Sequence, residues 1–387
     1  MEIATSRGAV RLGYCTNVHP AETLDDVIET LRVHALPLRR RLAPGRPFGV
    51  GLYLAAAVAR ELEADDHRRA VFRGWLEDED LDVFTVNAFP FGGFHAARVK
   101  EGVYRPDWRE RERIEHTIRV GRVLADLRPS GSRTSISTLA GAWVGAIPAA
   151  DAAPFLSRGL VEVAEAFARI RDETGRHLVI CPEPEPLTTL ETTADAARFW
   201  TDWLPAGRSV VREHVALCFD VCHQAVEMET MTGAVRRLVA AGVPIGKVQL
   251  SNALEVTDPN DEVARAALRA FDEPRYLHQT TSRDAGGRVV CASDLPDALA
   301  DDAWRSRAPW RVHFHVPVDR TEIPPLRTTR PLLLDAIEAL AGHADHYEVE
   351  TYTWDVLPPA ERPRGEASLV DGLERELRSM MEALARH

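Results

Sequence analysis

The chain has 387 residues, of which 45% are hydrophobic and 27% are charged, and its formal net charge is −12. This composition is ordinary for a globular protein, and the length suffices for one large barrel domain with insertions. The acidic balance argues against a nucleic acid as partner, and the lack of an 18-residue apolar run argues against direct membrane insertion, so a small-molecule metabolite is the expected ligand.

The cysteines indicate a reducing compartment. Five cysteines occur without a CxxC pair, and Cys181, Cys218 and Cys222 lie in or beside apolar runs. This pattern is typical of reduced, buried thiols. The first residues, MEIATSRGAVRLGYC, lack the apolar core of a secretory signal peptide. We therefore expect a cytoplasmic protein.

Short apolar runs alternate with stretches of helical periodicity along most of the chain. Thr23, with Asp26 three residues later, predicts the start of one helix, and Gly175 predicts the end of another. Continuously apolar strands alternating with helices predict a parallel sheet covered by helices, and about eight repeats predict a TIM-type (β/α)8 barrel. The strand-like runs are RLGYCTNV (11–18), FGVGLYLA (48–55), LDVFTVNAF (81–89), TSISTLAGAW (134–143), HLVICPEPEP (177–186), VALCFDVCH (215–223), IGKVQLSNA (245–253), WRVHFHVPV (310–318) and HYEVETYTW (346–354).

These nine runs exceed the eight strands of such a barrel. The irregular segment 254–309 predicts a long insertion after the strand near 245–253, so one run lies outside the barrel or pairs within the insertion. We expect residues 1–387 to form a single domain with a capping helix over 365–387. A doubly wound open sheet is the alternative fold, although no GxGxxG or GxxxxGK[ST] motif follows the first strand.

Acidic residues mark several strand ends, which is where the active sites of such barrels lie. Glu183 and Glu185 belong to CPEPEP, Asp220 and His223 to DVCH, and Glu350 to VETY. Each group also has a structural explanation: a solvated loop acid, a helix cap beside a packed histidine, or a salt bridge with a barrel arginine. Several carboxylates at one rim would repel one another unless a cation neutralised them.

The sequence leaves open which uncharged residue would bind a cation together with these acids. His313 and His315 share one face of a strand, whereas KVQLSN offers amide and hydroxyl groups, including Gln249. Carboxylates with an imidazole or amide suit Mn²⁺, Mg²⁺, Co²⁺ or Zn²⁺. Such an ion can chelate adjacent oxygens of a hydroxy-carbonyl substrate while a carboxylate removes the α-proton.

Glu183, the Asp220-x-x-His223 pair and Glu350 resemble the pattern of the xylose-isomerase-like TIM-barrel superfamily, which includes sugar-phosphate isomerases, ketose 3-epimerases, hydroxypyruvate isomerase and endonuclease IV. The resemblance to the epimerases implies that both glutamates are metal ligands and an acid–base pair. It implies that Asp220 is a ligand and that His223 contacts substrate or is a second ligand. Where that family carries a metal-ligating histidine this chain has Gln249, so either its amide replaces the imidazole or His315 takes over.

A narrower resemblance covers nearly the whole chain. The segments GYCTNVHP, VNAFPFGGFH, ISTLAG, PEPEP, KVQLSNAL, YLHQ and VETYTW look like the EboE-type proteins, bacterial TIM-barrel members of a metabolite-traffic operon. This resemblance implies a metabolite substrate and adds residues at the barrel mouth, where aromatic walls with a few polar anchors fit a sugar or cyclic metabolite. The substrate-binding candidates are Asn17, His19, Asn87, His95, Trp143, Glu185, Lys247, His278 and His313.

Three functions remain open. The favoured one is a divalent-metal-dependent isomerase or epimerase acting on a sugar-like, polyol or secondary-metabolite substrate. The second is a non-catalytic barrel that binds a metabolite within a biosynthetic export operon, as Gln249 and the traffic resemblance suggest. A DNA repair enzyme like endonuclease IV would need more metal histidines and a less acidic chain. A homo-oligomer or operon-encoded partners are compatible with the first two.

Overall fold

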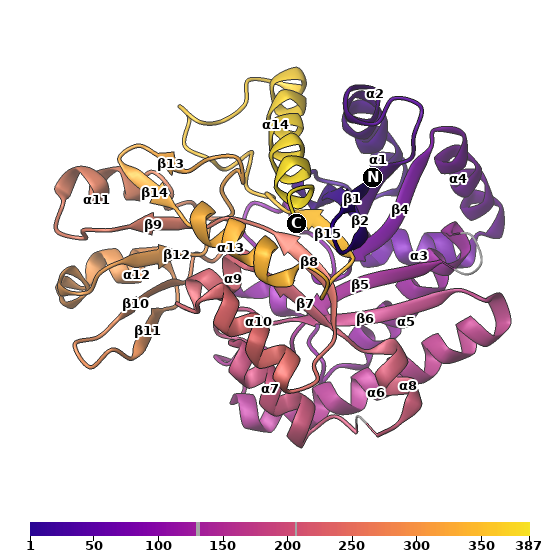
Figure 1. Ribbon diagram of the computed structural model, residues 1–387, viewed down its shortest axis with the longest axis horizontal. Helices are drawn as coiled ribbons and strands as arrows, with labels where there is room; N and C mark the ends of the chain where they lie inside the picture. Colours follow the sequence, from indigo (N-terminus) through magenta and orange to yellow (C-terminus); the bar gives the residue numbers. More distant parts are fainter. Residues whose placement is uncertain (129–131, 206) are drawn as a thin grey trace.

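The computed structural model describes residues 1–128, 132–205 and 207–387. In this part of the chain eight parallel strands form a barrel in the order β6-β5-β4-β3-β2-β15-β8-β7 (Figure 1). The end strands meet where the Ala216 amide donates to the Ile180 carbonyl at 3.0 Å. The predicted barrel is therefore confirmed, in preference to an open doubly wound sheet. Its strands are β2 (Gly8–Cys15), β3 (Phe48–Tyr53), β4 (Leu81–Asn87), β5 (Arg133–Leu139), β6 (His177–Glu183), β7 (Leu217–Asp220), β8 (Ile245–Leu250) and β15 (His346–Val349).

Helices follow most of the strands and cover the outside of the barrel (Figure 1). Thr23 and Asp26 form a capping box at the first helix, and α6 ends at Gly175 with a left-handed φ of 71°, as predicted for both. The helices are α1 (Leu24–Thr30), η2 (Leu31–Ala35), α2 (Leu36–Leu42), α3 (Ala56–Ala64), α4 (Asp66–Asp78), α5 (Arg111–Leu127), α6 (Ala149–Thr174), α7 (Thr193–Asp202), α8 (Ser209–His214), α9 (Val221–Val226), α10 (Met231–Ala240) and α13 (Arg330–Leu340). Strand β1 (Glu2–Thr5) pairs antiparallel with β2, and short helices η1 (Thr16–Val18) and η3 (Lys100–Tyr104) lie in loops.

A second, antiparallel sheet is inserted between β8 and α13, and its strands run β11-β10-β12-β9-β14-β13. It forms the lobe at the left of Figure 1. The run 310–318 is the one outside the barrel, because only its first three residues form a strand, and that strand pairs within this sheet. The sheet starts in the segment expected to be an insertion, 254–309, and continues to Thr328. Its elements are β9 (Leu254–Val256), α11 (Glu262–Arg269), β10 (Thr280–Arg283), β11 (Val289–Ala292), α12 (Leu295–Ala300), η4 (Asp302–Ser306), β12 (Trp310–Val312), β13 (Glu322–Ile323) and β14 (Leu326–Thr328).

The C-terminal helix α14 (Glu366–Leu384) ties two loops to the barrel through one buried acid. The Glu376 carboxylate accepts hydrogen bonds from Thr351 Oγ1 at 2.6 Å, the Val318 amide at 3.0 Å and Trp354 Nε1 at 3.0 Å. Burial raises the pKa of Glu376 to about 7. Since the two loops carry Glu350 and His315, α14 helps to fix the residues that form the mouth of the barrel.

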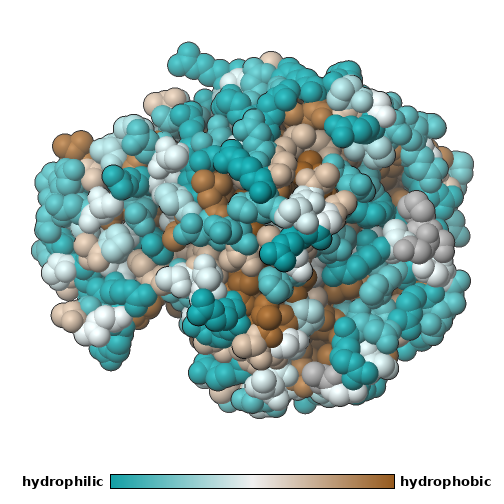
Figure 2. All heavy atoms as spheres, in the orientation of Figure 1, coloured by the Kyte–Doolittle hydropathy of each residue, from teal (hydrophilic) through white to brown (hydrophobic). Residues whose placement is uncertain are grey.

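The outer surface is mostly hydrophilic on the face shown in Figure 2, with hydrophobic residues gathered near its centre. A notch at the lower edge separates the lobe of the second sheet from the barrel. Over the described residues, none of the helices combines the length and apolarity needed to cross a membrane.

Candidate metal centre and active site

Three carboxylates from different strands converge at the C-terminal end of the barrel. Glu183 ends β6, Asp220 ends β7, and Glu350 directly follows β15. One oxygen of each lies within 4.8 Å of an oxygen of each of the others. All three side chains are buried, with at most 4% of any residue exposed. The structure therefore brings together the three acids that the sequence selected as metal ligands.

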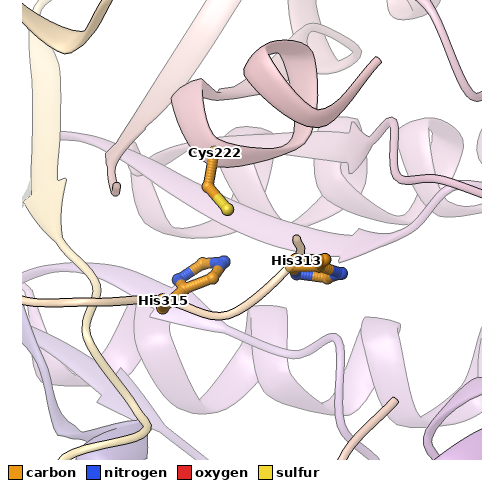
Figure 3. Close-up of side chains that lie close together, drawn as sticks. All are labelled: Cys222, His313 and His315. Carbon is orange, nitrogen blue, oxygen red and sulfur yellow. The ribbon is translucent and has the colours of Figure 1, made fainter. Parts of the chain in front are cut away.

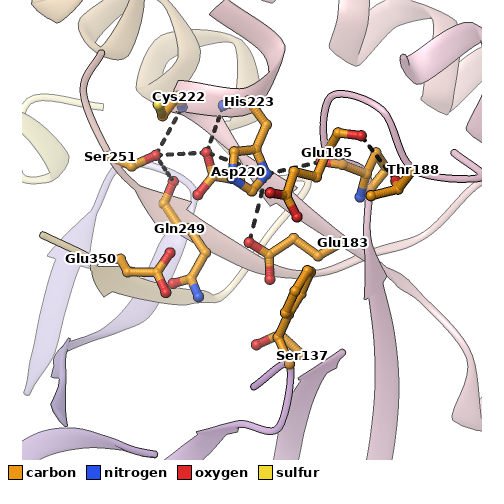
Figure 4. Close-up of polar contacts among 12 residues, drawn as sticks. Ser137, Glu183, Glu185, Thr188, Asp220, Cys222, His223, Gln249, Ser251 and Glu350 are labelled. Atoms are coloured by element: carbon orange, nitrogen blue, oxygen red, sulfur yellow. Dashed lines mark hydrogen bonds and ion pairs between the residues drawn. The ribbon is translucent and has the colours of Figure 1, made fainter. Parts of the chain in front are cut away.

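The Asp220 carboxylate has one occupied and one free oxygen. Oδ1 accepts hydrogen bonds from the His223 amide and from Ser251 Oγ, both at 2.8 Å, and it caps α9 (Figure 4). Oδ2 is buried and has no hydrogen-bond partner among the residues that the structure describes. The capping role that competed with the metal role thus uses only Oδ1, while Oδ2 remains available to an ion.

The two glutamates are held differently. Glu350 Oε1 accepts hydrogen bonds from Asn17 Nδ2 at 2.6 Å and Asn87 Nδ2 at 2.8 Å. Glu183 Oε2 is buried without a hydrogen-bond partner in the described part of the chain. Amide donors orient Glu350 but carry no charge, so they leave the repulsion within the cluster in place.

The electrostatics of the cluster follow from burial and from like charges. Burial, then Glu350 and Asp220, raise the pKa of Glu183 well above its usual value. Burial, then Asp220 and Glu348, do the same to the pKa of Glu350, and burial also raises the pKa of Asp220. Carboxylates that share a dry site resist ionising together. Without a cation, this cluster retains protons that an exposed cluster would lose.

A further buried acid, Glu348, lies inside the barrel, two residues before Glu350 and on the same face of β15. Lys247 Nζ forms an ion pair with Glu348 Oε2 at 2.7 Å and donates to Ser137 Oγ at 3.0 Å. Burial lowers the pKa of Lys247, but Glu348 and two nearby thiols outweigh it, so this pKa stands above its usual value. Gly51 makes room for the pair, because a Cβ there would overlap Glu348 Oε1.

Two uncharged donors lie beside the carboxylates. Gln249 is fully buried on β8, next to Asp220 in register, and within the described ranges neither atom of its side-chain amide has a hydrogen-bond partner. His315 Nδ1 donates to the Glu350 carbonyl oxygen at 2.8 Å, and Nε2 is buried with no hydrogen-bond partner among the described residues. Burial lowers the pKa of His315 to about 4, so its ring is neutral near pH 7. Either residue can therefore offer a lone pair to an ion.

A pocket opens above the cluster, and aromatic side chains form much of its wall. Tyr104 OH donates to Glu185 Oε1 at 2.9 Å and accepts from Gln279 Nε2 at 2.8 Å. Burial raises the pKa of Glu185 to about 8. The lining consists of Asn17, Asn87, Phe89, Pro90, Phe94, Val99, Lys100, Val103, Tyr104, Glu183, Glu185, His223, Tyr276, Leu277, His313, His315, Glu350 and Tyr352.

The remaining predicted substrate-binding residues lie outside this lining. His278 is buried behind it, where Nδ1 meets the His313 carbonyl at 2.9 Å and Nε2 meets Glu273 Oε1 at 2.8 Å. The other four have comparable partners: His19 stacks on His34, His95 Nε2 donates to the Asn17 carbonyl, Trp143 stacks over Tyr104, and Lys247 pairs with Glu348.

Several residues that shape the site were not selected from the sequence. Ser251 orients Asp220; its hydroxyl was noted within KVQLSN but not chosen, and it lies directly after the buried strand β8. Tyr104, Tyr276 and Tyr352 line the pocket from loops, where no periodicity marks them. Loop residues reach a site through tertiary structure, which local patterns do not encode.

No protein-family model and no curated protein matches the chain significantly. Similar solved structures include an L-ribulose 3-epimerase, with 15% identity over 97% of this chain and 94% of that chain and a TM-score of 0.49. The IolI protein with a bound zinc atom shows 11% identity over 97% and 98%, with a TM-score of 0.49. A xylose isomerase domain protein from Planctomyces limnophilus shows 12% identity over 96% of both chains, with a TM-score of 0.48. These likenesses extend over most of each chain, at low sequence identity.

Proposed function

We propose that this chain is a divalent-metal-dependent isomerase or epimerase that acts on a small sugar-like, polyol or secondary-metabolite substrate by carboxylate-mediated proton transfer. The observation that carries the proposal is the convergence of Glu183, Asp220 and Glu350 beneath a pocket with aromatic walls. Buried like charges of this kind cost free energy, and they are concentrated at functional sites. The pocket is also the place where a small ligand would meet them.

The residues present fit a divalent ion. Over the residues described, Glu183 Oε2 and Asp220 Oδ2 are buried without hydrogen-bond partners, and Gln249 or His315 offers a neutral donor beside them. Carboxylate oxygens with an amide oxygen or an imidazole suit Mn²⁺, Mg²⁺, Co²⁺ or Zn²⁺. When bound, such an ion would offset two of the three negative charges of the cluster and would polarise the adjacent oxygens of a hydroxy-carbonyl substrate.

Glu183 and Glu350 are the groups that we expect to move protons. Both line the pocket and both have raised pKa values, which bring a carboxylate closer to the basicity needed at a substrate carbon. Asn17 and Asn87 hold Glu350 in one orientation through its Oε1. Such positioning lets one carboxylate take the α-proton while the other returns a proton.

His223 orients the substrate in this account. Its Nδ1 donates to the Pro184 carbonyl oxygen at 3.0 Å, and burial lowers the pKa of the ring to about 3. A neutral ring with a proton on Nδ1 has a lone pair on Nε2. His223 lines the pocket, so Nε2 can accept a hydrogen bond from a substrate hydroxyl.

Exchange of substrate protons with solvent tests the proposal. Mn²⁺-loaded protein is incubated in deuterated water with a panel of neutral ketoses, polyol-derived ketones and hydroxy-ketones, and deuterium at the α-carbon is followed. We expect labelling of at least one class, and its loss in Glu183→Gln and Glu350→Gln. Glu115→Gln, on the exposed side of α5, is the matched control and should label normally. Binding of a compound without any labelling would contradict the proposal.

A non-catalytic metabolite-binding protein is the second candidate. The observation that favours it is Gln249, since an amide is a weaker metal donor than the imidazole expected at this strand. The resemblance of the sequence to EboE-type traffic proteins points the same way. Ligand binding with no exchange, in metal-loaded protein, is the result this candidate predicts.

A further inference from the structure

A cysteine and two histidines meet beside the carboxylate cluster, in a group that the proposed function does not use as a unit. Cys222 is the second residue of α9, and His313 and His315 follow β12. The Cys222 sulfur and one ring nitrogen of each histidine lie within 4.8 Å of one another (Figure 3). The exposed fractions are 0%, 4% and 0%, so the group is shielded from bulk water.

Both imidazoles are arranged as ligands with an unused lone pair. His313 Nδ1 donates to Gln279 Oε1 at 2.7 Å, and His315 Nδ1 donates to the Glu350 carbonyl oxygen at 2.8 Å. These acceptors fix the proton on Nδ1, and each Nε2 is buried without a hydrogen-bond partner in the part of the chain that the structure describes. An outer acceptor on one nitrogen and a free lone pair on the other is the usual arrangement of a metal-binding histidine.

The Cys222 sulfur points toward the two rings in Figure 3. Within the described residues, its sulfur takes part in no hydrogen bond, and the side chain packs with Val226 and Ala253. A thiol in this position is either a small packing group or a soft ligand. The two unpartnered nitrogens beside it favour the ligand.

We propose that Cys222, His313 and His315 bind a second divalent ion, of the borderline-soft class represented by Zn²⁺ and Co²⁺. One thiolate and two imidazoles are ligands that this class prefers, and they leave one coordination position open. Binding forms a metal–sulfur bond and breaks the S–H bond, so one proton per ion passes to solvent. No oxidant or reductant is needed.

A second ion at this group determines which of the two uncharged donors, His315 and Gln249, serves which metal site. His315 has one free lone pair, because Nδ1 is bound to the Glu350 carbonyl, and it can therefore serve one ion. With His315 at the second ion, Gln249 is left to complete the carboxylate site. Two divalent cations would also balance one thiolate and the three carboxylates of that site, so the buried charge is neutralised.

The second ion would join two parts of the fold. Cys222 belongs to the helix that follows barrel strand β7, whereas His313 and His315 belong to the inserted segment. Ion binding therefore fastens the insertion to the barrel at the edge of the pocket.

Cobalt absorption tests the proposal, because thiolate ligands give Co²⁺ an intense near-ultraviolet charge-transfer band that carboxylates and imidazoles do not. The full-length chain is stripped with a chelator and titrated with Co²⁺. We expect two bound ions and the charge-transfer band in the wild type. We expect one ion and no band in Cys222→Ala, with Cys222→Ser as a second variant in case one folds poorly. His313→Gln should weaken the band, and Cys291→Ser, which alters the exposed thiol, should retain it.

The wild type without the band at two equivalents of Co²⁺, or Cys222→Ala with the band intact, would overturn the proposal. The result is separable from the proposed function, because Glu183→Gln should abolish isotope exchange yet keep the cobalt–sulfur band. A band without exchange in any substrate would defeat the isomerase and leave the second site standing. Exchange without a band would do the reverse.

Discussion

Glu348 and Glu350 lie two residues apart at the end of β15 and point into the same barrel, yet their surroundings differ. Glu348 is paired with the buried ammonium of Lys247 at 2.7 Å. Glu350 accepts hydrogen bonds from the uncharged amides of Asn17 and Asn87, and it faces two further carboxylates. The inner acid is neutralised by the chain itself, and the outer cluster is not.

This difference separates a structural acid from a functional one. A buried charge needs a counter-charge, and at the inner level of the barrel the side chain of Lys247 supplies it to Glu348. At the outer level, formed by Glu183, Asp220 and Glu350, the described residues supply hydrogen bonds that orient the carboxylates but no paired lysine or arginine. We therefore infer that the outer level takes its positive charge from an ion in solution. The predictions below break or sharpen this contrast, from the largest expected effect to the smallest.

Removing the inner lysine should cause the largest loss. Lys247→Met leaves Glu348 buried without its partner, and breaking a buried pair in this way typically costs about 3–5 kcal/mol. We expect that loss in the free energy of unfolding measured by urea denaturation. Lys247→Met combined with Glu348→Gln should recover much of it, since no charge remains. A Lys247→Met protein as stable as the wild type would show that the pair is not structural.

Ser251→Ala should weaken ion binding at the outer level. Ser251 Oγ holds Asp220 Oδ1, and loss of such an outer partner commonly costs about 10- to 100-fold in metal affinity. Isothermal titration with Mn²⁺ measures this. Ser282→Ala, which removes a serine hydroxyl in the inserted sheet, is the matched control and should bind Mn²⁺ normally. Equal affinities in the two variants would remove Ser251 from the site.

Glu350→Gln should change the stability of the folded protein in opposite directions with and without a bound ion. In chelator-treated protein the change removes one member of a repelling cluster while the amide oxygen still accepts from Asn17 and Asn87, so we expect a gain on the order of 1 kcal/mol at pH 8. With Mn²⁺ present, the variant should be the less stable protein. Thermal melts in both conditions give the two signs, and the same sign in both would contradict a metal site.

The pH dependence of stability should reveal the raised pKa of Glu185. Its pKa rises from 4.5 to about 8 on folding, so the folded chain binds a proton that the unfolded chain releases. This contribution is complete below about pH 4.5 and is lost as pH rises toward 8. Glu185→Gln keeps the Tyr104 hydrogen bond and cannot ionise. In metal-free protein, wild-type stability should therefore fall relative to the variant across this interval; parallel curves would refute the shift.

The barrel could be predicted from the sequence because its evidence is periodic. Continuous apolar strands, a capping box at Thr23 and a left-handed Gly175 are local features, and the structure has all of them. Glu183, Asp220 and Glu350 could likewise be identified as one group from their positions at strand ends, because parallel strands bring their carboxyl ends to one rim.

The parts that could not be predicted depend on long-range pairing. The run 310–318 has the apolar character of a barrel strand, and only pairing with β9 and β10 shows that it lies elsewhere. Lys247 was predicted to bind substrate because its ion-pair partner, Glu348, is 101 residues away in sequence, on β15. Its inward direction on β8 and that of Glu348 were readable from alternation, but their register was not.

Thermal unfolding of chelator-treated protein with and without Mn²⁺ tests the central claim most directly. Mn²⁺ is a hard ion that suits the carboxylates and has little preference for the Cys222 sulfur. At an ion concentration of about 100 times Kd, binding should stabilise the wild type by about 2.7 kcal/mol, seen as a higher Tm. We predict that rise in the wild type and in Cys222→Ala, and its absence in Glu183→Gln and Glu350→Gln. A wild-type Tm unchanged by Mn²⁺, Mg²⁺, Co²⁺ and Zn²⁺ would contradict the account.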